Sequence, residues 1–211
     1  MKTKQQIQNN EFKQTELGEI PREWDIVRLG EVFVEINKNS RKIEIKQNEE
    51  YKLILTKLYA KGIRLKEIKS GKKISAKIMY ILKKGDFIFS KINIRKGSFD
   101  FVPEELSGAI VSTEHPILNL NRDNANQEFL KFYLSQQFVW ENLKEEAKGF
   151  AGKERIKSRE LLLFKIPLPP LSEQKSIAYV LSTVQEAKEK SERTINSLKE
   201  LKKSMMKYLF T

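Results

Sequence analysis

The last forty residues of the chain constrain the fold most, because residues 172–211 contain neither proline nor glycine. Proline breaks helices because it lacks a backbone N–H, and glycine weakens them because its backbone is too free. The sequence therefore predicts one continuous helix, about 57 Å long at 1.5 Å per residue. Ser172 is the expected N-cap, and Lys202, Lys203 and Lys207 lie near the expected negative end of the helix dipole.

Apolar and small residues recur along this helix with a period of seven, which is typical of a coiled-coil seam. The ten seam positions are Ile177, Val180, Val184, Ala187, Ser191, Thr194, Leu198, Leu201, Met205 and Tyr208. A long helix with such a narrow apolar stripe needs a partner for that stripe. We expect a coiled coil or an antiparallel pair with a second chain, and the alternative is a helix that folds back onto its own domain.

A proline-rich segment leads directly into the predicted helix. Residues 166–174 read Ile-Pro-Leu-Pro-Pro-Leu-Ser-Glu-Gln, and three prolines in four positions cannot lie in a helix interior. Because proline fixes φ near −65°, the segment is expected to be stiff and extended. It would set the angle between the helix and the domain before it.

Residues 17–171 are expected to form that domain, and residues 1–16 a polar, loosely held N-terminal arm. Turn signals separate short β-like runs at 24–29, 51–55, 74–81, 86–90, 108–112, 116–120 and 161–168. A helical turn is expected at 31–36. From 126 to 148 the apolar period becomes helical, with Asn124 or Asn126 as the cap and Gly149 as the end. The expected fold class is α+β: a sheet-rich domain followed by a long coiled-coil helix at 172–211.

The net charge of +12 is concentrated in particular segments. Residues 61–100 hold 12 basic and 3 acidic side chains, and residues 148–171 hold 6 and 2, whereas residues 101–147 hold 3 and 8. A biased genome would explain abundant lysine, but it does not explain this change of sign along the chain. A localised positive field is typical of a protein that binds a polyanion, and it favours nucleic acid as the partner.

The basic segments contain the candidate contacts to nucleic acid. Alternation in residues 91–96 predicts a strand or ribbon with Lys91, Asn93 and Arg95 on one face. Lysine and arginine neutralise phosphates, and arginine and asparagine also pair with base edges. The candidate residues are Lys61, Arg64, Lys72, Lys73, Lys91, Asn93, Arg95, Lys96, Lys153, Arg155 and Arg159. Each of them alone would read as a solvated surface side chain.

We find no catalytic or metal-binding motif in the sequence. Glycine-rich nucleotide loops are absent, and so is the Asn/Asp-Pro-Pro-aromatic motif of an amino-methyltransferase. The single histidine, His115, cannot form a histidine cluster, and it is expected at a strand end. Glu44-Ile-Lys46 fits a nuclease tripeptide, but it fits by chance in a chain this rich in charge. The chain is therefore expected to bind rather than to catalyse.

Neither a signal peptide nor a membrane span is predicted, because no long apolar run is present. The sequence contains no cysteine, which excludes disulfides and thiolate metal sites. These features favour a cytoplasmic protein.

Three stretches resemble the specificity subunits of type I restriction–modification systems. They are Leu17-Gly-Glu-Ile-Pro-Arg-Glu-Trp-Asp-Ile-Val-Arg-Leu-Gly-Glu-Val32, then Lys84-Gly-Asp-Phe-Ile-Phe-Ser-Lys91 with Gly108-Ala-Ile-Val-Ser-Thr113, and the proline segment with its Glu-Gln pair and helix. The proline junction is the most specific of them, and the resemblance extends from about residue 15 to the end. It implies a target recognition domain followed by a helical spacer.

Ordinary members of that family carry two such domains and two spacer helices that pack antiparallel, whereas this sequence has one of each. The resemblance therefore implies either a half-subunit that forms a homodimer or part of a longer chain. It implies double-stranded DNA as the ligand, and methyltransferase and restriction subunits as partners. S-adenosylmethionine would belong to the methyltransferase, and ATP and Mg²⁺ to the restriction subunit. The alternative function is a stand-alone nucleic-acid-binding adaptor, for example one that binds RNA.

Overall fold

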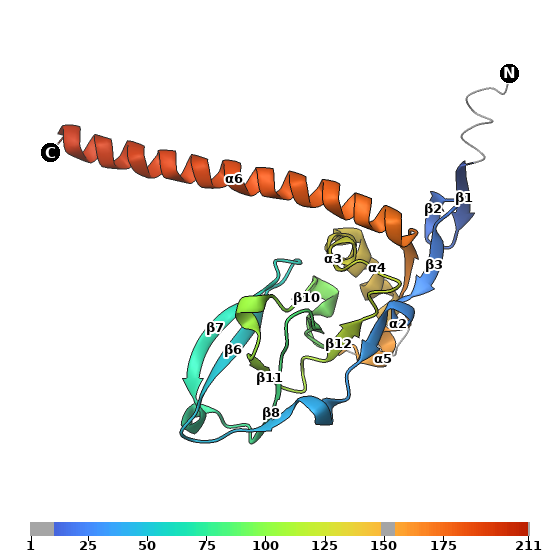
Figure 1. Cartoon of the computed structure of the whole chain (residues 1–211), viewed down its shortest axis with the longest axis horizontal. Helices are drawn as coiled ribbons and strands as arrows, with labels where there is room; N and C mark the ends of the chain where they lie inside the picture. The colour runs from blue at the N-terminus through green and yellow to red at the C-terminus, as the bar shows by residue number, and fades with distance from the viewer. Residues whose placement is uncertain (1–10, 149–154, 211) are drawn as a thin grey trace.

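The computed structural model describes residues 11–148 and 155–210. A sheet-rich domain lies below the first part of a single long helix, α6 (Leu171–Phe210), and the C-terminal part of the helix extends past the domain (Figure 1). The helix has 40 residues, which corresponds to about 60 Å. The predicted α+β class with a long terminal helix is confirmed.

Two sheets form most of the domain. The four-stranded sheet is antiparallel and has the order β10 (Phe99–Phe101), β9 (Phe87–Phe89), β12 (Ile117–Leu120) and β4 (Phe33–Glu35). The five-stranded sheet has the order β5 (Lys42–Glu44), β8 (Ile78–Ile81), β11 (Ile110–Val111), β6 (Glu50–Thr56) and β7 (Ile63–Ser70). Its neighbours are antiparallel except β11 and β6, which pair parallel.

Two small ribbons and several short helices complete the domain. The ribbons are β1 (Phe12–Thr15) with β2 (Gly18–Pro21), and β3 (Asp25–Arg28) with β13 (Lys165–Leu168). The α-helices are α2 (Leu29–Val32), α3 (Gln127–Leu134), α4 (Gln137–Lys148) and α5 (Ser158–Leu161). The 3₁₀ turns are η1 (Lys38–Arg41), η2 (Gly71–Lys73), η3 (Ile94–Lys96) and η4 (Glu104–Leu106).

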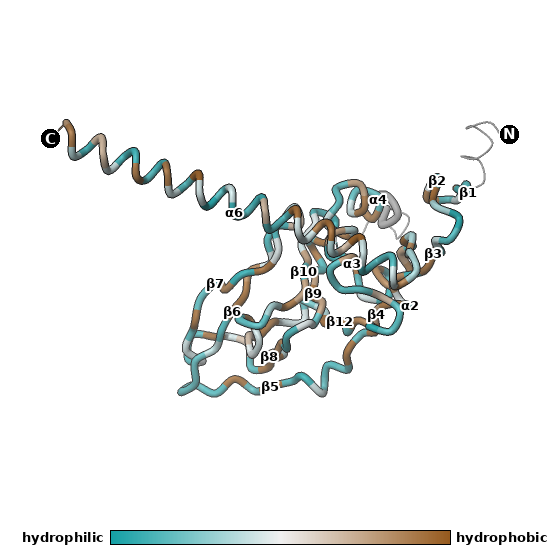
Figure 2. The backbone as a smooth tube through the Cα atoms, turned by 45° about the horizontal axis from the view of Figure 1, so that its top comes forward, coloured by the Kyte–Doolittle hydropathy of each residue, from teal (hydrophilic) through white to brown (hydrophobic). Residues whose placement is uncertain are grey.

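The main core lies between the four-stranded sheet and the helices. It contains seven buried phenylalanines, and several of their rings are in contact: the Phe33 and Phe87 rings are 4.8 Å apart, and those of Phe87 and Phe101 are 5.1 Å apart. Ala178 and the half-buried Ile177 join this core from the start of α6. The first turns of α6 are therefore part of the domain, whereas all side chains from residue 183 to 210 are exposed. Figure 2 shows hydrophobic positions recurring along this exposed length.

The proline segment joins the domain to α6 through a buried amide. Pro167 lies in β13 opposite Ile26, and the chain turns into the helix at Pro169 and Pro170. The Gln174 side chain is fully buried: its Oε1 accepts from the Asn126 backbone N–H at 2.8 Å, and its Nε2 donates to the Pro169 carbonyl at 2.8 Å and to the Asn124 carbonyl at 3.2 Å.

A second hydrogen bond supports the same junction: Trp24 Nε1 donates to Glu173 Oε2 at 3.1 Å. These contacts support the expected role of the proline segment in fixing the helix direction. The predicted N-cap, Ser172, lies inside the helix, because α6 begins at Leu171. The Pro170 carbonyl accepts from the Gln174 backbone N–H at 3.0 Å, so the helix begins one residue earlier than predicted.

Several local predictions differ from the structure. Residues 12–15 of the expected arm pair with β2, and the expected helical turn at 31–36 is divided between α2 and β4. The expected helix at 126–148 is two helices, because the chain breaks at Ser135 and Gln136. Asn126 caps the first of them, with its Oδ1 accepting from the Phe129 N–H at 3.0 Å. The expected end at Gly149 lies outside the described residues.

The predicted strands are mostly present but shorter. The run at 51–55 is confirmed as β6, whereas only 78–81 of 74–81 and 165–168 of 161–168 are strand. Leu161 instead ends α5. The sequence analysis did not predict strand β7, because the basic residues at its start are typical of a loop.

Candidate nucleic-acid interface

Four basic side chains from three distant segments line one groove. The basic groove has a volume of about 280 Å³ and is lined by Lys38, Lys91, Lys157 and Arg159, together with Glu35 and Ser158. The Ile156 N–H donates to the Lys91 carbonyl at 2.9 Å, so residues 155–159 lie against the end of β9. Predicted residues Lys91 and Arg159, which are far apart in the sequence, therefore line the same surface.

The groove has a net positive field. Burial lowers the pKa of Lys91, and the neighbouring charge of Lys38 lowers it further, while Glu114 and Glu35 oppose this effect. Arg155 Nη1 lies 3.5 Å from Glu114 Oε1 beside the groove. Glu35 is held by a hydrogen bond from Ser158 Oγ at 2.8 Å. An anion that entered the groove would relieve the repulsion between these cations.

Segment 91–97 connects the groove to the tip of the β6–β7 hairpin. The prediction that Lys91, Asn93 and Arg95 lie on one face of a strand is wrong, because residues 94–96 form η3. Asn93 is the residue before this turn, and its carbonyl accepts from the Lys96 N–H at 2.9 Å and from the Ser98 N–H at 3.2 Å. The tight turn requires Gly97 in the left-handed region, with φ +67°.

The hairpin tip, residues 57–62, is held against η3. The Tyr59 N–H donates to the Lys96 carbonyl, and the Ala60 N–H donates to the Gly97 carbonyl at 2.8 Å. Tyr59 and Ala60 have positive φ values of 60° and 51°, which is strained backbone for residues other than glycine. The Tyr59 side chain is nevertheless 58% exposed, and its ring is 6.1 Å from that of Trp140. An exposed aromatic ring therefore lies beside Lys61 and Lys96.

The remaining predicted residues that the structure describes lie in two different places. Arg64 is in β7 near the hairpin tip. Lys72 and Lys73 are in η2, at the opposite end of β7 from the tip, and they do not join this surface. Lys153 lies outside the described residues. Sequence reasoning missed Lys38, Lys157 and Tyr59. The lysines close to Tyr59 in the sequence could have identified it as a candidate contact to nucleic acid.

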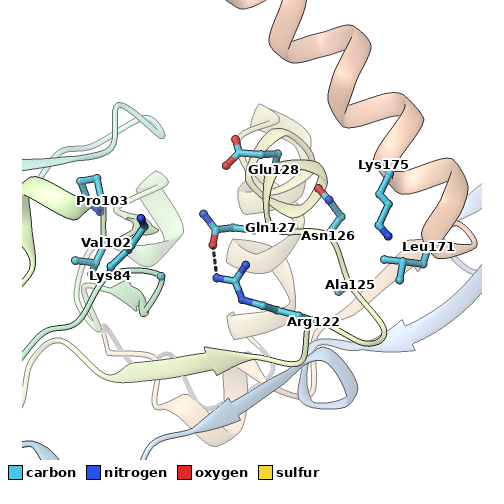
Figure 3. Close-up of a pocket in the computed structure, with 11 residues that line it drawn as sticks. Lys84, Val102, Pro103, Arg122, Ala125, Asn126, Gln127, Glu128, Leu171 and Lys175 are labelled. Carbon is cyan, nitrogen blue, oxygen red and sulfur yellow. Dashed lines mark hydrogen bonds between the residues drawn. The ribbon is translucent and has the colours of Figure 1, made fainter.

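A second basic pocket lies where the domain meets α6. This junction pocket has a volume of about 460 Å³, and Lys84, Arg122 and Lys175 are among the residues that line it, with Lys84 and Lys175 on opposite sides (Figure 3). Two of these cations are already engaged: Lys84 Nζ lies 2.6 Å from Glu104 Oε2, and Arg122 Nη2 donates to Gln127 Oε1 at 3.0 Å. The pocket is therefore less available to an anion than the groove is.

The candidates for chemistry do not assemble into a site. His115 lies in the turn between β11 and β12, with its Nε2 3.3 Å from Thr56 Oγ1. Lys46 Nζ pairs with Glu49 Oε1 at 2.8 Å rather than with Glu44. In the part of the chain that the structure describes, no group of three or more His, Cys, Asp or Glu residues is placed to hold a metal ion. Within the same residues, no helix is long and apolar enough to cross a membrane.

Nine of the ten predicted seam positions are exposed on α6. Tyr208 is 86% exposed and Val184 is 61% exposed, and no described part of the domain covers either of them. Ile177 is the exception, because it packs against the core of its own domain. A fold-back of the whole helix onto the domain, the alternative weighed from sequence, is therefore wrong.

Two solved structures share the fold of this chain. The chain aligns with the crystal structure of the HsdS subunit from Thermoanaerobacter tengcongensis with a TM-score of 0.62 and 22% identity, over 82% of this chain and 45% of that one. It aligns with a chain of a structure on complex assembly and conformational transition of the type I R-M system with a TM-score of 0.61 and 22% identity, over 81% and 44%.

The sequence comparisons then give the family. Residues 21–200 match the type I restriction modification DNA specificity domain, and the chain belongs to that family. Among curated proteins of Methanocaldococcus jannaschii, it is 31% identical to the protein named as the specificity subunit of type I restriction enzyme MjaX, over 95% of this chain and 48% of that protein. It is 28% identical to the type I restriction enzyme MjaVIII specificity subunit, over 95% and 45%. The chain thus spans about half the length of the curated relatives it matches.

Proposed function

We propose that the domain recognises duplex DNA and that the chain serves as the specificity component of a type I restriction–modification complex. The observation that carries this proposal is the convergence of Lys38, Lys91, Lys157 and Arg159 on one groove. Cations in such a groove neutralise phosphates and set the register of the protein on DNA. The hairpin tip beside it offers Tyr59, Lys61 and Arg64 as contacts to bases or further phosphates.

The chain acts by positioning rather than by catalysis. It directs adenine methyltransferase subunits, which bind S-adenosylmethionine, and restriction subunits, which use ATP and Mg²⁺. Two copies pair through the exposed seam of α6, so that two recognition domains are carried at opposite ends of a rod. A symmetric pair of identical domains reads a bipartite site whose halves are inverted repeats.

The test is to co-express the chain with its cognate methyltransferase and to map modified adenines across the host genome. We expect a split, self-complementary motif that disappears when the chain is omitted. A split but asymmetric motif would keep the recognition role and reject the homodimer. No new methylation, with both proteins soluble and bound to each other, would favour the stand-alone adaptor instead.

A further inference from the structure

The turn between β9 and β10, residues 90–98, has a backbone that is fixed by its own hydrogen bonds. The Ser90 carbonyl accepts from the Asn93 N–H at 3.1 Å and from the Ile94 N–H at 2.8 Å. The Asn93 carbonyl accepts in turn from the N–H groups of two later residues of the turn. The Ile94 side chain is 2% exposed and belongs to the main core. The side chains that leave this turn toward solvent therefore start from fixed positions.

Ile92 is the exposed apolar side chain of this turn. It is 42% exposed, and it lies in the chain between Lys91, which lines the basic groove, and the exposed Lys96. A single exposed isoleucine needs no explanation by itself, but this one lies in the segment that connects the basic groove to the hairpin tip. When that surface binds duplex DNA, the apolar group that the base edges offer to Ile92 is the C5 methyl of thymine, which projects into the major groove.

Asn93 has a side-chain amide that is not used by its own turn. It precedes η3, and asparagine in such a position usually bonds to nearby backbone. Asn37, before η1, accepts from the Asn39 N–H at 3.0 Å, and Asn126, before α3, accepts from the Phe129 N–H at 3.0 Å. The Asn93 side chain makes no capping bond, and within the described part of the chain its amide bonds to no other group. A donor and an acceptor are thus available together, and this pair complements N7 and N6 of adenine.

We propose that the turn recognises A·T base pairs in the major groove, with Asn93 bonding to adenine N6 and N7 and Ile92 packing against the C5 methyl of thymine. This inference rests on the DNA recognition of the proposed function, and it specifies which bases the surface selects. The cations of the basic groove hold the protein on the phosphates, whereas the two side chains supply the sequence preference. The fixed backbone of the turn keeps both of them in the geometry that such contacts need.

Removal of single methyl groups from the DNA tests the Ile92 contact. The full chain, together with its methyltransferase, first selects a motif from a random duplex library. Deoxyuridine then replaces each thymidine of the motif in turn, which removes only the C5 methyl. At one position the native chain is expected to bind about 4-fold more weakly, because a buried methyl group contributes about that factor. Ile92→Ala should bind the two duplexes equally. A native chain that tolerates every replacement overturns the contact, and so does a variant that keeps the native ratio.

Removal of the adenine N7 acceptor tests the Asn93 contact in the same way. 7-Deazaadenine carries a C–H group in place of N7 and keeps the N6 amino group. The native chain is expected to bind a duplex with this replacement about 5-fold or more weakly at one position of the motif, since a bidentate contact discriminates by at least that factor. Asn93→Ala should bind the natural duplex with the same loss and show no further loss on replacement. Additive losses would mean that Asn93 does not contact N7.

Asn93→Asp tests the assignment by a change of base preference. A carboxylate only accepts hydrogen bonds, so adenine N7 repels it, whereas the N4 amino group of cytosine donates to it. Library selection with this variant should give cytosine where the native chain selects adenine. Asn196→Asp adds the same charge at an exposed position of α6, and it is the matched control that should keep the native motif. An unchanged motif in the Asn93→Asp variant overturns the proposal.

The same selection separates this inference from the proposed function. If the native chain with its methyltransferase enriches no motif, the recognition of duplex DNA is itself rejected. If it enriches a motif that the Ile92 and Asn93 substitutions leave unchanged, only the assignment to this turn is rejected. Neither side chain belongs to the buried core, so the circular dichroism of the variants should match that of the native chain. A changed motif then reflects the contact and not misfolding.

Discussion

Gln174 on the long helix accepts a hydrogen bond from the backbone N–H of Asn126 at 2.8 Å, and Asn126 in turn caps α3. The buried amide of Gln174 thus connects the start of α6 to the start of α3 in the domain. Because the same side chain donates to the Pro169 and Asn124 carbonyls, it bonds three backbone groups of two chain segments. Together with the Trp24–Glu173 hydrogen bond and the packing of Ala178 in the core, this amide holds α6 against the domain.

Substitution Gln174→Leu is expected to destabilise the domain and loosen the rod. It leaves the Asn126 N–H and the Pro169 carbonyl without their partner inside the junction, and buried unpaired groups cost about 1–3 kcal/mol each; the Asn124 carbonyl lies on an exposed residue and can bond to water instead. We expect a loss of about 3 kcal/mol in the free energy of unfolding, measured by chemical denaturation. Gln185→Leu is the matched control, because Gln185 is exposed on the same helix. Equal effects of the two substitutions would contradict the role of the buried amide.

Loss of cations from the basic groove is expected to reduce the salt dependence of DNA binding. Lys157→Ala and Arg159→Ala each remove one contact that neutralises a phosphate, which lowers the slope of log K against log salt by about 1 per contact. The α5 start should survive, because Lys157 bonds Glu160 through its backbone N–H at 2.7 Å. Fluorescence anisotropy across a salt series measures the slope. Lys72→Ala with Lys73→Ala is the control outside the groove, and an equal change there would argue against this surface.

Truncation of Tyr59 is expected to weaken binding without changing the salt slope. In duplex DNA an aromatic ring packs against base edges and thymine methyl groups in a groove, so Tyr59→Ala should lower affinity for the target about 5-fold or more through lost apolar contact. Tyr59→Phe keeps the ring and is expected to retain most of the affinity. Tyr179→Ala removes another exposed tyrosine, on α6, and should have no effect. If Tyr59→Ala binds like the native chain, the hairpin tip does not touch bases.

His115 is expected to make stability depend on pH. Burial lowers its pKa below the ordinary 6.5, with Lys91 adding to the effect and Glu114 opposing it. Between the folded and unfolded pKa values the unfolded chain binds more protons, so stability falls as pH drops below about 6.5. Since this is the single histidine, His115→Asn should flatten that part of the pH profile. Unfolding midpoints at about pH 7.5 and about pH 5.5, on either side of the ordinary histidine pKa, measure the change, and an unaltered profile in the variant would contradict it.

The local sequence pattern was sufficient to predict the long helix α6, but it was not sufficient to predict the basic groove. The absence of proline and glycine over forty residues leaves few alternatives to a helix, and β6 follows from its β-branched and apolar run. The segment 91–96 alternates like a strand, yet Gly97 and the Ser90 carbonyl, which accepts from Asn93 and Ile94, close it into a turn. Such tertiary and turn contacts override a short periodic signal.

The approach of Arg159 to Lys91 depends on a backbone hydrogen bond between Ile156 and Lys91, which no local pattern encodes. The end of α3 could not be predicted from the local sequence pattern either. Residues 126–148 keep a helical period throughout, but the Ser135 hydroxyl bonds to the Lys131 carbonyl at 2.6 Å and the helix stops there. Side-chain bonds of this kind compete with the helical ladder, so a continuous apolar period does not ensure a continuous helix.

Shortening α6 is expected to weaken binding to the whole bipartite site without changing binding to a single half-site. Deletion of residues 188–194 removes one heptad and keeps the seam in phase, but it shortens each helix by about 10.5 Å, equal to about three base pairs. The two domains then no longer match both halves of the site, and the gain from simultaneous binding is lost. We expect weaker binding to the bipartite site with unchanged binding to a single half-site, both measured by anisotropy. Equal binding of the shortened and native chains to the whole site would mean that α6 does not set the spacing.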